Sequence, residues 1–136
     1  MVSRVIPVDP FDLVIFGGTG DLAKRKILPG LFRRFVSGQM PSEALIMGAA
    51  RAKMNDTEYR DLVKIAILEF GSAPLDERLL VDFLDKVTYL RIDATGEAGW
   101  LELSQSMRNG PVRAFYFSVA PSLFGALAER LKKHKI

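Results

Sequence analysis

The chain has 136 residues, enough for one compact domain with its own core and too few for two ordinary domains. Its composition, 49% hydrophobic and 26% charged, excludes a disordered or collagen-like chain, and no apolar run is long enough to predict a membrane partner or span. No cysteine is present, which excludes thiolate metal sites and suits a cytoplasmic protein, and the mild, scattered net charge of +3 predicts no nucleic-acid partner.

The first half of the chain predicts two buried strands separated by a helix. An apolar run at 12–17, rich in branched and aromatic residues, is typical of a buried strand, and a helical pattern covers about 21–36. Pro29 falls inside that pattern, where it removes a helical hydrogen bond and clashes with the preceding turn. We therefore expect the helix to kink or restart there. The second strand is predicted at 45–50.

Strands and helices continue to alternate to the end of the chain. Asn55 and Glu58 form a predicted capping box for the next helix, and Ser72 with Pro74 is predicted to begin another. The remaining predicted elements are strands at 87–92 and 112–119, a helix at 97–107, and a last helix that includes Leu123 and Leu131.

This alternation predicts the fold class. Strands joined through helices need right-handed crossovers, which produce a parallel sheet with helices on both faces. We predict an α/β, doubly wound, three-layer domain of the Rossmann type over 1–136. Four strands are few for this architecture, so we expect a fragment that is truncated on the carboxyl side of its sheet.

A glycine-rich loop follows the first predicted strand and opens the first helix. Gly18, Gly20 and Ala23 match the pattern G-x-G-x-x-G/A. Glycine permits a tight turn and a close approach of the backbone to a diphosphate, and a small residue at the third position lets helix and strand pack closely. The unpaired N–H groups at the helix start would then hold the diphosphate. The loop predicts a dinucleotide site.

Basic residues indicate which dinucleotide binds. Domains that prefer NAD place an acid after the second strand, whereas here Arg51 offers a guanidinium suited to a 2′-phosphate. Cations in a first helical turn oppose the helix dipole unless an anion lies nearby, which makes Lys24 and Lys26 candidates for phosphate contacts. Arg25 is equally explained as a solvated residue. The sequence therefore favours NADP.

Three segments resemble the glucose-6-phosphate dehydrogenase family: GGTGDLAKRKILPGLF at 17–32, GAAR at 48–51 and FYFSVAPSLF at 115–124. The resemblance implies an oxidoreductase of the oxidative pentose phosphate pathway, which oxidises glucose 6-phosphate to 6-phosphogluconolactone and transfers a hydride to NADP. It also implies a homo-oligomeric parent enzyme. An isolated fragment would pair with itself through its exposed sheet edge.

The family pattern, carried onto this chain, implies four groups of contacts. It places the coenzyme phosphates at Gly17, Gly18, Thr19, Gly20, Asp21, Leu22, Ala23 and Lys24, the 2′-phosphate at Arg51, the adenine at Asp93 and Ala94, and the inner half of the coenzyme at Ser118 and Val119. Lys26 is implied to lie toward the substrate.

No catalytic residue is assigned in this chain. The family's catalytic histidine belongs to an Asp-His-Tyr-Leu-Gly-Lys segment that is absent here, and His134 is predicted to be solvated in a basic tail. Two alternatives remain open: a free-standing NADP-sensing regulatory module, and a short-chain-dehydrogenase-like domain. The second lacks the Tyr-x-x-x-Lys pair of that class, because Tyr59, Tyr89 and Tyr116 are not followed by lysine at that spacing.

Overall fold

Four strands form one parallel sheet in this computed structural model, which describes residues 9–71 and 75–136. The strands are β1 (Phe11–Phe16), β2 (Leu45–Ala50), β3 (Val87–Arg91) and β4 (Val112–Phe117). Their order across the sheet is β3-β2-β1-β4. β2 and β3 therefore lie on one side of β1, and β4 lies on the other. The predicted strands are confirmed, with β4 ending two residues earlier than expected.

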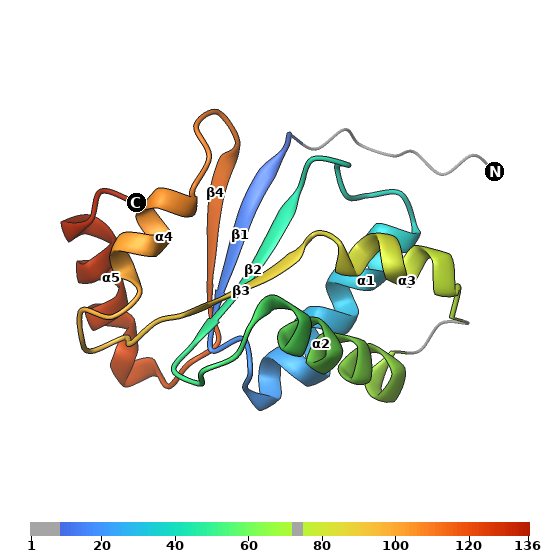
Figure 1. Ribbon diagram of the computed structural model, residues 1–136, viewed down its shortest axis with the longest axis horizontal. Helices are drawn as coiled ribbons and strands as arrows, with labels where there is room; N and C mark the ends of the chain where they lie inside the picture. Colours follow the sequence, from blue (N-terminus) through green and yellow to red (C-terminus); the bar gives the residue numbers. More distant parts are fainter. Residues whose placement is uncertain (1–8, 72–74) are drawn as a thin grey trace.

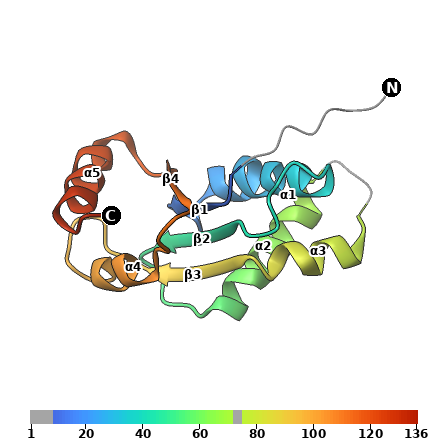
Figure 2. The same cartoon turned by 90° about the horizontal axis from the view of Figure 1, so that it is seen from above.

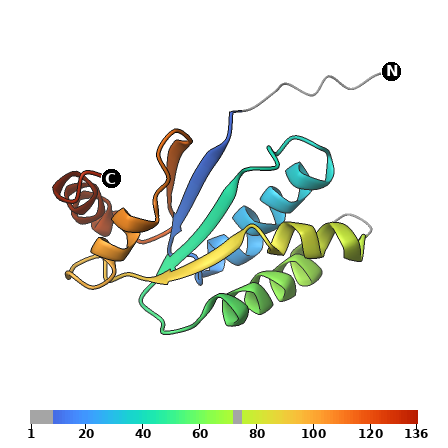
Figure 3. The same ribbon diagram turned by 45° about the horizontal axis from the view of Figure 1, so that its top comes forward.

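Helices cover both faces of the sheet, which confirms the doubly wound α/β fold. Figures 1, 2 and 3 show α4 and α5 on one side of the sheet and α1, α2 and α3 on the other. The helices are α1 (Leu28–Val36), α2 (Asp56–Phe70), α3 (Glu77–Leu84), α4 (Trp100–Ser106) and α5 (Phe124–Lys133), with short turns η1 (Ala23–Ile27) and η2 (Pro121–Leu123). In the part of the chain that the structure describes, no helix could cross a membrane.

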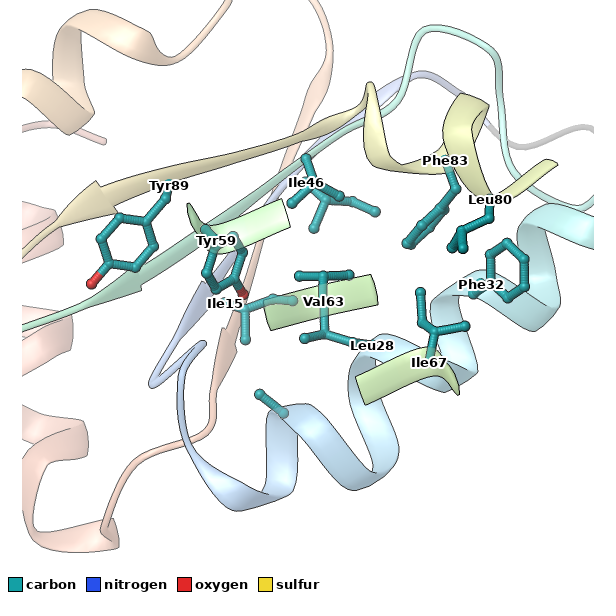
Figure 4. Close-up of a cluster of buried hydrophobic side chains, with 12 residues drawn as sticks. Ile15, Leu28, Phe32, Ile46, Tyr59, Val63, Ile67, Leu80, Phe83 and Tyr89 are labelled. Carbon is teal, nitrogen blue, oxygen red and sulfur yellow. The ribbon is translucent and has the colours of Figure 1, made fainter. Parts of the chain in front are cut away.

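Each face of the sheet has its own apolar core, because successive side chains of a strand point to opposite faces. Ile15 and Ile46 of the strands pack with side chains of α1, α2 and α3 in one cluster (Figure 4). Val14 and Phe16 pack on the other face with Trp100 and with residues of α4 and α5. The carboxyl ends of the strands lie at one end of the sheet, because all four strands are parallel.

Glycine and proline account for most differences between the observed helices and the predicted ones. A π-helical turn, η1, precedes α1, and the hydrogen-bond pattern changes one residue before Pro29. The helix continues through this change without a break, so the predicted interruption takes the form of a change of helix type rather than a restart. Helix α4 begins at Trp100 rather than Glu97, because Gly99 has a φ of 89° and interrupts the helical backbone. Helix α3 begins at Glu77 and is capped by Asp76. The predicted start at Ser72 and Pro74 lies outside the described residues.

Candidate coenzyme site

The candidate site lies where the strand order reverses. In an open α/β sheet, ligands bind in the crevice outside the carboxyl ends of the strands at such a point. Phe16 at the end of β1 is aligned with Ala49 of β2 and with Phe117 of β4. The segments that follow these strands therefore meet at one edge: the glycine loop after β1, Arg51 after β2 and Ser118 after β4.

The glycines of the loop are required by its surroundings. Gly17 has a φ of 80°, and a Cβ at this position would lie 2.0 Å from the backbone oxygen of Ser118. A Cβ at Gly18 would lie 2.8 Å from the hydroxyl of Tyr59 and 3.0 Å from Cα of Gly48. Larger residues would push the loop away from β2 and β4, so these glycines bring the backbone close to both strands.

Hydrogen bonds determine which loop amides face a ligand. The N–H groups of Gly17 and Gly18 both donate to the carbonyl of Ala49, at 2.8 and 3.2 Å, and therefore tie the loop to β2. The first helical bond runs from the Lys24 N–H to the Gly20 carbonyl, at 3.1 Å. The amides of residues 21–23 thus form the first helical turn, where N–H groups lack helical partners and attract anions.

The side chains around this turn differ in burial and in their neighbours. Ala23 is fully buried in the core beneath α1, α2 and α3, as expected of the small residue that lets helix and strand pack closely. Arg25 Nε donates to Asp21 at 2.8 Å, and its guanidinium lies 4.8 Å from the centre of the Phe70 ring. Asp21, Leu22 and Lys26 are exposed and Lys24 is half-buried. Arg25 therefore differs from Lys24 and Lys26, because its side chain is held by Asp21 and Phe70.

A crevice of about 230 Å³ opens beside the loop at the carboxyl ends of the strands. Four of the predicted coenzyme residues, Gly17, Arg51, Ala94 and Val119, contribute to its wall. The full lining is Phe16, Gly17, Ala49, Ala50, Arg51, Ile92, Ala94, Val119 and Leu123. The lining is mostly apolar with one guanidinium at its margin, as suits the ring and ribose of a nucleotide.

Asp93 lies next to the crevice rather than in its wall. Its carboxylate accepts hydrogen bonds from the N–H and the hydroxyl of Thr95, at 3.0 and 3.1 Å, and these bonds lower the pKa of Asp93. The indole of Trp100 donates to the Asp93 carbonyl at 2.9 Å. The turn after β3 is thus fixed from both ends, which positions Ala94 in the crevice.

A buried tyrosine of α2 supports the loop. Tyr59 on α2 is fully buried, and its hydroxyl donates to the Gly18 carbonyl at 2.9 Å. Its ring occupies the space that a Cβ at Gly48 would need, since that Cβ would lie 2.2 Å from Cζ. Burial raises the pKa of Tyr59, so its hydroxyl remains a donor. The sequence alone does not indicate which backbone atom this hydroxyl reaches.

Lys26, the predicted substrate-side residue, lies apart from this crevice. It lines a separate groove of about 470 Å³ between α1 and β4, with two arginines of α1 and with Tyr116 of β4. Tyr116 is exposed at this groove. The groove is basic along α1, and a role for Lys26 toward a sugar phosphate stays a prediction.

His134 corrects a prediction. Its side chain is only 20% exposed and stacks on the Trp100 indole at 6.1 Å between ring centres, so it is not solvated. The chain turns back after α5, with the Ile136 N–H donating to the Leu131 carbonyl, and this return holds the ring against α4. Its Nε2 lies 3.8 Å from Glu97. His134 does not line the crevice.

The parallel sheet, its reversal point and the glycine loop define a dinucleotide-binding domain of the Rossmann class. The chain belongs to the glucose-6-phosphate dehydrogenase family: the family model described as "Glucose-6-phosphate dehydrogenase, NAD binding domain" matches residues 14–136. This match makes the chain a nucleotide-binding domain for NAD or NADP and favours neither of the two alternative classes.

Known relatives agree with this assignment. The chain is 40% identical over its whole length to the glucose-6-phosphate 1-dehydrogenase of Rhizobium meliloti, and 37% identical over 95% of its length to that of Gluconobacter oxydans. It spans only 28% and 27% of those proteins.

Two solved structures have the same fold. A glucose-6-phosphate dehydrogenase in complex with glucose 6-phosphate matches the whole chain with a TM-score of 0.82 at 28% identity, and 29% of that protein is covered. The glucose-6-phosphate 1-dehydrogenase of Mycobacterium avium matches 93% of the chain with a TM-score of 0.84 at 27% identity, and 27% of it is covered.

Proposed function

We propose that this chain is the NADP-binding domain, over 1–136, of an enzyme that oxidises glucose 6-phosphate to 6-phosphogluconolactone. NADP, when bound, would accept the hydride. The proposal rests on the family membership and on one observation: the crevice at the reversal point is bordered by Arg51, with no acidic residue between Leu45 and Arg51. An acid there would bind a ribose hydroxyl, whereas a guanidinium pairs with a phosphate.

The crevice and the segments around it would hold the parts of NADP in order. The amides of residues 21–23, with Lys24 beside them, would hold the diphosphate, because this turn combines free N–H groups with the positive end of the helix. Arg51 would hold the 2′-phosphate, and Asp93 with Ala94 would border the adenine. Ser118 and Val119 would lie along the inner half of the coenzyme, toward the substrate.

The activity is tested with the protein in its natural length. Glucose 6-phosphate is supplied with NADP or with NAD, and the reduced nicotinamide is followed by its absorbance. We expect a higher kcat/KM with NADP. Reduction of neither coenzyme in the presence of glucose 6-phosphate would contradict the proposed reaction, and equal values for the two would contradict the NADP preference.

The coenzyme preference is tested through Arg51. Replacing Arg51 by Ala removes a charge-assisted contact to phosphate, so we expect NADP affinity to fall about 10- to 100-fold. NAD, which has no 2′-phosphate, serves as the internal control and keeps its affinity. The measurement is calorimetric titration of the wild type and the variant with both coenzymes. An Arg51→Ala variant with full NADP affinity would contradict this role.

We propose a cytoplasmic location and a homo-oligomeric assembly for the whole protein. These 136 residues contain no cysteine, as suits a reducing compartment in which disulfides do not contribute to stability. Sedimentation of the whole protein measures the assembly directly.

A further inference from the structure

A second arginine lies beside Arg51, contributed by the neighbouring strand. Arg91 is the last residue of β3, and its Cα is paired with that of Ala50, the residue before Arg51. The Arg91 Nε donates to the Arg51 carbonyl at 3.0 Å. This bond holds the guanidinium of Arg91 against the turn that carries Arg51.

Both arginines line one hollow of about 390 Å³, together with Ala52, Asp93 and Ala98. Arg51 also lines the crevice of the proposed coenzyme site. Arg51 therefore borders both the crevice and the hollow. A ribose bound in the crevice and facing Arg51 would direct its 2′-substituent across that residue into the hollow, where Arg91 lies.

The charges in the hollow favour an anion. Among the described residues, neither Arg51 nor Arg91 forms a salt bridge. The carboxylate in the same hollow is that of Asp93, whose pKa is lowered by its hydrogen bonds from Thr95 and, to a smaller extent, by the charge of Arg51 without a direct ion pair. The acidic residue of the hollow, Asp93, directs its Oδ1 to the N–H and hydroxyl of Thr95. A phosphate monoester has almost two negative charges at neutral pH, and two guanidiniums match them better than one.

We propose that Arg91 is a second specificity-determining contact for the 2′-phosphate of NADP. The inference rests on the proposed NADP function and extends it to a residue of β3. Arg91 binds the phosphate through its terminal nitrogens, while its Nε stays on the Arg51 carbonyl. The same side chain thus contacts the ligand and positions the backbone of the other contact.

The test uses the natural-length protein and two probes, NADP and NAD, which differ only in the 2′-phosphate. We expect Arg91→Gln to weaken NADP binding about tenfold while NAD binding changes less than about twofold. Arg91→Lys keeps the charge and recovers part of the loss. Arg78→Gln is the matched control, because it removes an exposed arginine from α3, outside the hollow, and leaves both affinities unchanged.

The outcomes separate the two proposals. If Arg91→Gln binds NADP as tightly as the wild type, the role of Arg91 is wrong although the NADP function stands. An equal loss for NADP and NAD also overturns it, since Arg91 would then only brace the turn. If the wild type itself binds NAD as tightly as NADP, the proposed preference fails, and the role of Arg91 fails with it.

Discussion

At the scale of single residues, two tyrosines join the glycine loop to the turn that holds Arg51. Tyr59 donates to the Gly18 carbonyl, and its ring lies 5.0 Å from that of Tyr89. The Tyr89 hydroxyl approaches the carbonyls of Ala50 at 3.1 Å and Ala52 at 2.5 Å. The glycine loop and the turn that carries Arg51 are therefore both hydrogen-bonded to this pair of buried tyrosine rings.

Replacing Tyr59 by Phe tests this support through stability. The variant leaves the buried Gly18 carbonyl without its donor, so we expect the free energy of unfolding to fall by about 1–2 kcal/mol at neutral pH. Urea unfolding of wild type and variant measures the difference. An unchanged midpoint would show that the hydroxyl contributes nothing to the fold.

The same variant has a predicted pH dependence. Burial raises the pKa of Tyr59 above its ordinary value of 10.0, so the folded state keeps a proton that the unfolded state releases. The stabilisation that depends on a protonated Tyr59 is fully present below pH 10.0, the pKa in the unfolded state, and is lost as the pH rises toward the higher pKa of the folded state. We expect the wild type to lose up to about 1.4 kcal/mol per pH unit more than Tyr59→Phe in alkaline solution. Parallel alkaline curves for the two proteins would contradict this.

At the scale of elements, a buried ion pair connects β1 with two loops at the amino edge of the sheet. Asp12 is 5% exposed and accepts from the Arg108 N–H at 3.1 Å and from its Nε at 2.9 Å. The Arg108 guanidinium also donates to the Glu43 carbonyl, before β2, at 2.8 Å. Arg108 thereby links the loops before β2 and β4 to β1, at the end of the sheet opposite the proposed coenzyme crevice.

We predict that Arg108→Met destabilises the protein by about 2–3 kcal/mol, because it leaves a buried carboxylate without its cation. Arg108 is partly exposed, which places the expected value below that of a fully buried pair. The double variant Asp12→Leu with Arg108→Met removes both charges and recovers most of the loss. Thermal unfolding measures all three proteins, and a double variant less stable than Arg108→Met would contradict this explanation.

The elements were largely predictable because each has a local signal. Asn55 and Glu58 form both bonds of the predicted capping box, at 2.8 and 3.0 Å, and the strands follow their apolar runs. The start of α4 was misplaced because Gly99 has a positive φ and lies close to the Arg91 carbonyl, a contact within the turn after β3 that periodicity does not indicate.

The close packing of the glycine loop was predictable where a motif specifies backbone geometry, as at Gly18 and Ala23. The contacts of Tyr59, Arg91 and His134 were not, because each depends on a partner from another element. Strand pairing and helix docking bring these partners together, and neither composition nor periodicity contains that information.

At the scale of the whole molecule, one face of β4 is open in this chain. β4 is an edge strand of the sheet, and its side chains Val112 and Tyr116, on the face covered elsewhere by α1, are 54% and 45% exposed. Leu13 of β1 lines the hollows beside them. An unpaired strand edge with apolar neighbours is a site for pairing with another chain.

We predict that the 136-residue chain alone associates with itself through β4. Lysine at both Val112 and Tyr116 places charges on this face, so the double variant should shift the population toward monomer. Sedimentation velocity at several concentrations measures the shift. A wild-type chain that stays monomeric and monodisperse would contradict the prediction.

The two cores become complete at different points of the sequence. All buried members of the cluster under α1, α2 and α3 come from between Ile15 and Tyr89, whereas the opposite cluster needs Leu127. Synthesis on the ribosome delivers the amino-terminal part first. A nascent chain can therefore consolidate half of its interior while the backbone of Ser118, against which Gly17 rests, has not yet been translated. Coenzyme cannot stabilise that intermediate, because the backbone that completes its glycine loop follows β4.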